Sequence, residues 1–147
     1  MTDADVRRLA DDPELSVEIS TGTEHWRVGE ITLVVEGTGE AQVIHRKAGT
    51  ETRYTRSLGH EELAGLAGRL ADDGFLELAP SRNEYVPDES TVTLALRRGG
   101  EDVHRAHLPE GDRYERPGLD RLLDDYEGLV ERITDGALPW GPASEPR

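Results

Sequence analysis

Hydrophobic and polar residues alternate along the first part of the chain. Leu15, Val17 and Ile19 share one face of a first stretch, with serine and glutamate between them. Further runs rich in β-branched residues or threonine follow at 31–35, 41–45 and 50–57. Period-two alternation is typical of strands with one buried face, and glycines between such runs are typical of hairpin turns. The pattern predicts a meander of four antiparallel strands.

The period then changes from two to 3.6 residues. The hydrophobic residues of the next segment recur on a single helical stripe: Leu63, Leu66, Ala67, Leu70 and Ala71. Acidic residues precede this stripe, where they complement the positive end of a helix dipole, and Gly74 follows it as a left-handed cap. This predicts a helix over 61–73, after which Phe75 and its hydrophobic neighbours fold back on the core.

The second half repeats the same succession. Alternation returns at 91–96, and Gly99-Gly100 predicts a tight turn into a partner strand over 102–108. A proline typical of a helix start then precedes the clearest helical stripe, which is formed by Leu119, Leu122, Leu123, Tyr126, Leu129, Val130 and Ile133. Gly136 is expected to end that helix.

This order of elements predicts an α+β fold, an antiparallel sheet of five to six strands with two helices packed on one face. A parallel sheet would need a crossover after almost every strand. We expect a single domain over 14–136, a flexible or helical N-terminal arm over 1–13 that stays outside the core, and a flexible tail over 137–147.

Charge narrows the classes of function. The chain of 147 residues has 31 acidic and 17 basic residues and a formal charge of −14. Such a field repels nucleic acid and anionic lipid and attracts basic surfaces. The absence of cysteine excludes disulfides and thiolate chemistry. With no apolar stretch of membrane-spanning length, the expected location is the cytoplasm, and a single lysine among many arginines is typical of a GC-rich bacterial genome.

Histidines and carboxylates are the candidates for chemistry. His104 and His107 are the weak candidates for a metal, but a strand sends residues three apart to opposite faces unless it bulges between them. Acidic pairs recur along the chain, and most are expected to lie on solvated faces without converging in space. Asp88 is the exception, because it ends a loop just before a strand. No catalytic residue, metal or cofactor is predicted, and no nucleophile elbow or phosphate-binding loop is present.

Aromatic residues in irregular segments are candidates for a binding surface. Trp26, Tyr85 and Tyr114 lie outside the predicted cores of strands and helices, where an aromatic either seals a core edge or anchors a partner. Together with Asp88 they are the predicted partner-binding residues. Trp140 lies in the predicted tail.

A few features resemble the emfourin type of small bacterial domain, a group of proteinaceous inhibitors of thermolysin-like metalloproteases. These are the opening alternating strand, the helix 61–73 followed by Gly74-Phe75-Leu76, Asp88 before the strand at 91–94, the Gly99-Gly100 hairpin and the closing helix. The segment after the first strand departs from the family, because Ser20-Thr21-Gly22-Thr23 leads into additional strands. The resemblance implies a fold and carries no functional residue.

Three functions remain open at this point. The favoured one is a non-catalytic binding or regulatory module, inhibitor-like or immunity-like, whose acidic surface covers a basic protein partner. The second is a small hydrolytic or metal-dependent enzyme that uses His104 or His107 with Asp88. The third is a structural homo-oligomer joined through a strand edge or through the tail, so the chain is expected to be a monomer or a homodimer.

Overall fold

A computed structural model describes residues 6–22, 29–78 and 91–138. The elements in chain order are η1 (Arg8–Asp11), β1 (Leu15–Thr21), β2 (Glu30–Glu36), β3 (Glu40–Lys47), β4 (Thr50–Ser57), α2 (His60–Asp72), β5 (Thr91–Arg98), β6 (Glu101–Pro109), η2 (Glu110–Tyr114) and α3 (Pro117–Thr134). Each strand and helix expected from the sequence is present, with boundaries within a few residues of those predicted.

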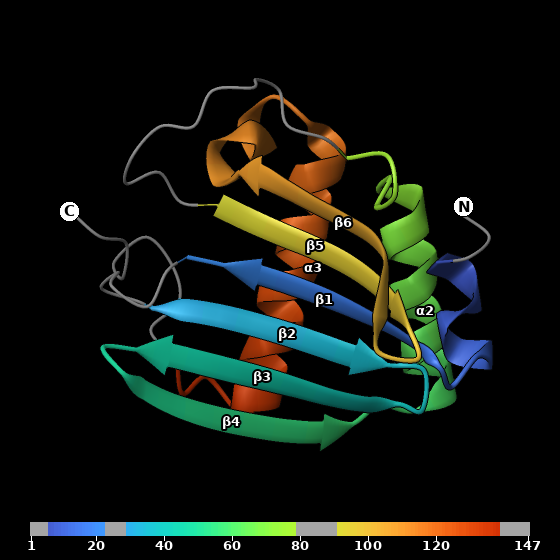
Figure 1. The fold of residues 1–147 in the computed structure, drawn as a ribbon, viewed down its shortest axis with the longest axis horizontal. Coiled ribbons are helices and arrows are strands. Elements are labelled where there is room, and N and C mark those ends of the chain that lie inside the picture. The colour runs from blue at the N-terminus through green and yellow to red at the C-terminus, as the bar shows by residue number, and fades with distance from the viewer. Residues whose placement is uncertain (1–5, 23–28, 79–90, 139–147) are drawn as a thin grey trace.

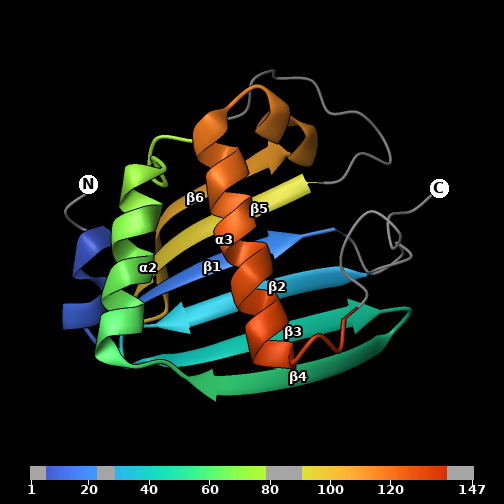
Figure 2. The ribbon, with the colours of Figure 1, turned by 180° about the vertical axis from the view of Figure 1, so that it is seen from behind.

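The strands form one antiparallel sheet, and both long helices cover the same face of it (Figure 1). Its order is β4-β3-β2-β1-β5-β6, so β1 lies in the middle and β4 and β6 are the edges of the described sheet. Seen from behind, α3 runs across the strands while α2 lies beside it (Figure 2). The predicted α+β fold is confirmed.

The core fills the space between the sheet and these helices. Alternate residues of β1, β2 and β5 point into it, and α2 and α3 add the leucine stripes that the sequence predicts. Tyr126 reaches from α3 to the sheet, where its hydroxyl donates to the carbonyl oxygen of Ile31 at 2.7 Å and contacts the Thr21 hydroxyl at 2.8 Å. These bonds satisfy the only polar group of a side chain that is otherwise sealed in hydrocarbon.

The turn after α2 forms as the glycine predicts. Gly74 has φ of 80°, its N–H donates to the Ala71 carbonyl oxygen, and the N–H of Phe75 donates to that of Leu70. This pair of bonds is a Schellman motif, which satisfies carbonyls at the helix end and reverses the chain. Phe75, directly after this turn, is completely buried in the core.

The expectation that the N-terminal arm, residues 1–13, lies outside the core is wrong for its described part. Val6 and Leu9 are completely buried and belong to the main hydrophobic cluster. The backbone of this segment lies so close to the β2–β3 turn that a Cβ at Gly37 would collide with the carbonyl oxygen of Asp12. Val6 and Leu9 are too few to establish a period in a short and mostly polar segment, so the sequence signal was too weak. At the other end Leu138 is also buried.

Candidate functional site

Acidic charge is concentrated on the helices. Together α2 and α3 hold eight acidic and three basic residues, a net charge of −5. The six strands hold seven acidic and seven basic residues, a net charge of zero. The helical layer in the foreground of Figure 2 therefore carries more negative charge than the strands, with −5 of the formal −14 of the whole chain.

An open cleft of about 390 Å³ lies between the two helices. Its lining is entirely charged and consists of Arg69, Asp72, Asp73, Arg121, Asp124 and Asp125. We call it the interhelical cleft. The C-terminal end of α2 contributes Asp72 and its C-cap Asp73, so the negative end of the helix dipole adds to the negative charge of these carboxylates.

Asp73 is the unusual member of this group. Its side chain is only 5% exposed, and its Oδ1 accepts a hydrogen bond of 3.0 Å from Nε of Arg121, whose side chain is 59% exposed. Its other oxygen, Oδ2, is buried and has no hydrogen-bond partner among the residues that the structure describes. Desolvation raises the pKa of Asp73, and the Arg121 hydrogen bond offsets only part of that effect. The molecule thus carries a buried carboxylate that is half satisfied, which is energetically unfavourable.

The other carboxylates of the cleft are paired with arginines at its rim. Arg69 contacts Asp125 at 3.1 Å, and Asp72 receives Arg7 at 2.6 Å. Asp124 shares one guanidinium with Asp120 and Glu127, that of Arg113. Because one cation serves three carboxylates, this end of the cleft keeps an excess of negative charge.

Close backbone contact fixes the two helices at this point. Gly118, in the first turn of α3, lies directly against the backbone of Asp73, and a Cβ there would collide with the Asp73 carbonyl oxygen. Arg132 on α3 also contacts Glu62 on α2 at 3.4 Å. The cleft is therefore held by rigid elements.

The cleft overturns one expectation about the acidic pairs. Most acidic pairs are expected to lie on solvated faces without converging, whereas the structure brings Asp72-Asp73 and Asp124-Asp125 to the same cleft. Each pair sits on a different helix, and only the crossing of α2 and α3 makes them neighbours. Pairs of adjacent carboxylates are common in an acidic sequence, so they do not predict which helices will cross.

The two histidines lie on opposite faces of the sheet, as alternation predicts. His104 pairs with Leu96 on the core side, and His107 pairs with Thr93, whose hydroxyl lies 2.9 Å from its Nδ1. The register shift in this hairpin falls at Leu96/Arg97, outside the segment between the histidines. One metal ion cannot bind both. Within residues 6–22, 29–78 and 91–138, no group of three or more potential metal ligands is present.

Of the predicted partner-binding residues, Tyr114 alone can be placed. It ends η2 and is 86% exposed, which suits an anchor on a surface. Trp26, Tyr85 and Asp88 lie outside the described residues, as does Trp140. The predicted aromatic patch stays a prediction.

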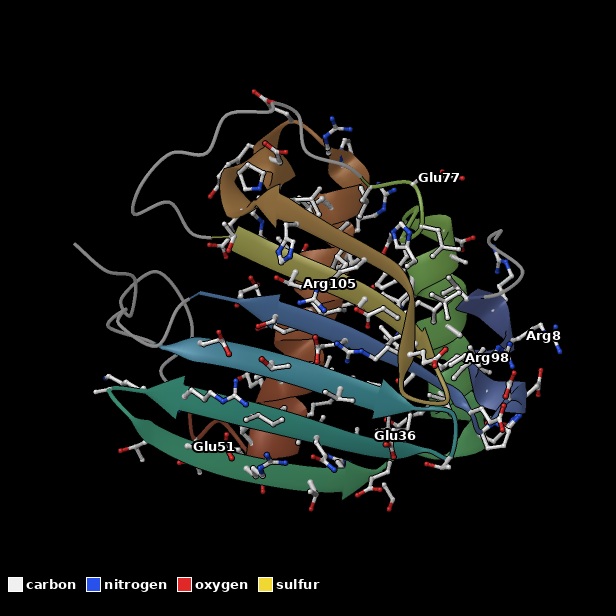
Figure 3. The ribbon with its side chains drawn as sticks, in the orientation of Figure 1. Arg8, Glu36, Glu51, Glu77, Arg98 and Arg105 are labelled. Atoms are coloured by element: carbon white, nitrogen blue, oxygen red, sulfur yellow. The ribbon has the colours of Figure 1, made fainter. Side chains whose placement is uncertain are left out.

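The uncovered face of the sheet is a second polar surface, with Arg105 and Glu51 labelled in Figure 3. A hollow of about 280 Å³ is lined there by hydroxyls, two glutamates, Ile44 and two arginines. Opposite charges on this face already pair with one another, because Arg97 contacts Glu18 at 3.0 Å and Asp102 at 2.6 Å. An antiparallel sheet commonly keeps one such face in water, so we place the candidate site at the interhelical cleft.

Neither long helix could serve as a membrane span, and the described residues contain no other candidate. The resemblance to emfourin-type domains stays a prediction, because comparisons with protein-family models and with curated proteins found no match for the chain.

Proposed function

We propose that this protein is a non-catalytic binding module that docks on a basic protein through its helical layer, with the interhelical cleft receiving an arginine of the partner. The observation that supports this most directly is the buried Oδ2 of Asp73, which has no partner in the described part of the chain and belongs to a residue that lines a cleft of charged side chains. Buried polar groups are nearly always hydrogen-bonded, so an exception calls for an explanation, and a partner that supplies the missing donor is one.

On docking, the guanidinium of Arg121 would leave Asp73 and the guanidinium of a partner arginine would take its place. Arg121 uses a single nitrogen on Asp73 and is more than half exposed, so it can move away at low cost. An incoming arginine could then bind both carboxylate oxygens at once, which is stronger and more directional than the single bond that it replaces. The excess charge of α2 and α3 would accelerate encounter with a basic surface.

In this proposal the protein acts by covering its partner, as an inhibitor or immunity protein does, and works in the cytoplasm. It would need no cofactor. Binding strength would fall steeply with salt, because much of the attraction comes from a screened field.

The test uses two labelled peptides of equal length and charge, one rich in arginine and one rich in lysine, and fluorescence anisotropy at low and high salt. We expect the arginine peptide to bind more tightly. Asp73→Asn should weaken its binding roughly tenfold, because one charge-assisted hydrogen bond of about 1.5 kcal/mol is lost. Arg121→Gln should strengthen it, because the competing guanidinium is gone.

Matched variants separate the cleft from general attraction by charge. Glu36→Gln and Arg105→Gln make the same two charge changes on the strands and should leave affinity nearly unchanged. Equal effects of the cleft and strand variants, or equal affinity for both peptides, would contradict the proposal.

A stability measurement provides an independent check. Asp73→Asn should raise the free energy of unfolding at neutral pH, because the folded protein no longer buries an ionised oxygen without a partner. A residue that costs stability while supporting binding is the signature expected of a functional site. Chemical denaturation at pH 7 measures this, and a loss of stability would argue that Asp73 is purely structural.

A further inference from the structure

The two edges of the sheet differ in how they are protected. The β6 strand contains a register shift opposite Leu96/Arg97 and ends in Pro109, and both features discourage pairing with another strand. The β4 strand keeps an unbroken register with β3 over all eight residues and contains no proline. Among the described residues no strand pairs with its outer side, as Figure 1 shows at the lower edge of the sheet.

The hairpin between β3 and β4 determines which backbone groups of β4 face outward. Ala48 and Gly49 both have positive φ, 50° and 83°, so the turn is a two-residue turn closed by the hydrogen-bonded pair of Lys47 and Thr50. Hydrogen-bonded and non-hydrogen-bonded pairs alternate along an antiparallel ladder. The residues whose N–H and C=O groups point away from β3 are therefore Glu51, Arg53, Thr55 and Ser57.

We propose that this edge pairs with the same edge of a second copy of the chain, which forms an antiparallel β4–β4 contact and one continuous sheet. A two-fold axis perpendicular to the sheet keeps equivalent faces together, so the contact must be centred on a residue. Centring on Tyr54 engages every outward-facing residue of both strands. Centring on Arg53 would place two guanidinium groups opposite one another, and the remaining positions leave fewer residues paired.

Side chains favour the register centred on Tyr54. In it, Arg53 faces Thr55 of the second copy, and Glu51 faces Ser57. Tyr54 is half-buried against the core and would meet its own copy at the axis, where an aromatic pair adds to the backbone hydrogen bonds.

The charge distribution allows this contact despite the formal charge of −14. The strands are neutral as a group, and β4 itself has one acidic and two basic residues. The net negative charge lies outside the strands, so repulsion between two copies acts from a distance, and added salt should screen it and strengthen the dimer. Because a single strand pair forms a small interface, we expect reversible association that depends on concentration.

Sedimentation velocity of the full chain over a concentration series tests the proposal. The wild type should shift from the mass of one chain to that of two, more so at high salt. Thr55→Pro removes one outward N–H that the monomer does not use, and edge strands tolerate proline at such positions, so it should remain monomeric. Thr55→Val keeps the N–H and should dimerise like the wild type.

Hydrogen exchange by NMR tests the same contact without a substitution. The amides of Glu51, Arg53, Thr55 and Ser57 should exchange more slowly as the concentration rises, while those of β6 should not change. A monomeric wild type at every concentration, a dimer that persists in Thr55→Pro, or unchanged exchange along β4 would overturn the proposal.

Discussion

At the scale of the residue, two buried polar side chains have opposite effects on the stability of the fold. Tyr126 is completely buried, yet its hydroxyl donates to Ile31 and contacts Thr21, so α3 is tied to β1 and β2 by hydrogen bonds as well as by packing. Asp73 shows the opposite situation, a buried oxygen that has no partner within residues 6–22, 29–78 and 91–138. The first residue stabilises the fold, and the second is the group that we assign to binding.

Tyr126→Phe should lower the free energy of unfolding by about 1–3 kcal/mol, because the Ile31 carbonyl oxygen is left buried without its donor. Burial also raises the pKa of Tyr126, against a smaller opposing effect of the Thr21 hydrogen bond. The folded state therefore favours the neutral phenol, whose contribution is present below about pH 10 and is lost as the pH rises through the folded pKa.

Urea denaturation at neutral and alkaline pH measures both effects. Tyr114→Phe is the control, because Tyr114 is 86% exposed and should change stability by less than about 0.5 kcal/mol. Equal small effects of the two substitutions would show that the buried hydroxyl contributes little.

At the scale of the element, the start of α3 is packed against the end of α2 more closely than any side chain permits. Gly118 provides this approach, and it lies against the backbone of Asp73, which lines the interhelical cleft. On the same helix Gly128 is exposed, and a Cβ there would meet nothing within 4 Å. Substituting alanine at each glycine therefore distinguishes the effect of close packing, at Gly118, from the effect of helix propensity, at Gly128.

Gly118→Ala should destabilise the protein by about 1–3 kcal/mol, because the helices must move apart to accommodate the new methyl group. Gly128→Ala should stabilise it by about 0.5–1 kcal/mol, because alanine is the better helix former. Thermal and urea unfolding measure both. A stabilising Gly118→Ala would contradict the close contact, and the same variant should also weaken binding of the arginine peptide.

At the scale of the whole molecule, the stability at low pH depends on two kinds of carboxylate, those whose pKa is lowered by folding and one whose pKa is raised. A hydrogen bond from the Glu14 backbone lowers the pKa of Asp12, and hydrogen bonds from Arg46 and Arg97 lower those of Glu51 and Asp102. A lowered pKa contributes stability above the unfolded value that disappears as the pH falls. The effect of Asp73 on the pH dependence of stability has the opposite sign, because the pKa of Asp73 is raised.

We expect the stability of the wild type to fall as the pH drops below the ordinary range of carboxylates, because groups with a lowered pKa lose their contribution there. Asp102→Asn should reduce that slope. The stability advantage of Asp73→Asn over the wild type should shrink on acidification, because protonation relieves the same cost in the wild type. Urea midpoints across a pH series measure this, and an advantage that grows toward low pH would show that Asp73 is favourably paired.

The sequence by itself determined the elements and the class of fold. Periods of two and 3.6 residues placed the strands, α2 and α3, and glycine placed the turns, because these signals arise from neighbours along the chain. The acid excess was likewise readable from composition. Short signals failed: Val6 and Leu9 were expected outside the core and are buried.

Only the tertiary structure decided where the charge gathers and which carboxylates meet. The Asp72-Asp73 and Asp124-Asp125 pairs converge because α2 and α3 cross on one face of the sheet, a contact between residues about fifty positions apart. The burial of Asp73, its bond to Arg121 and the position of β4 at an edge of the described sheet also depend on how the elements pack. No local pattern records such contacts, because they depend on how whole elements fit together.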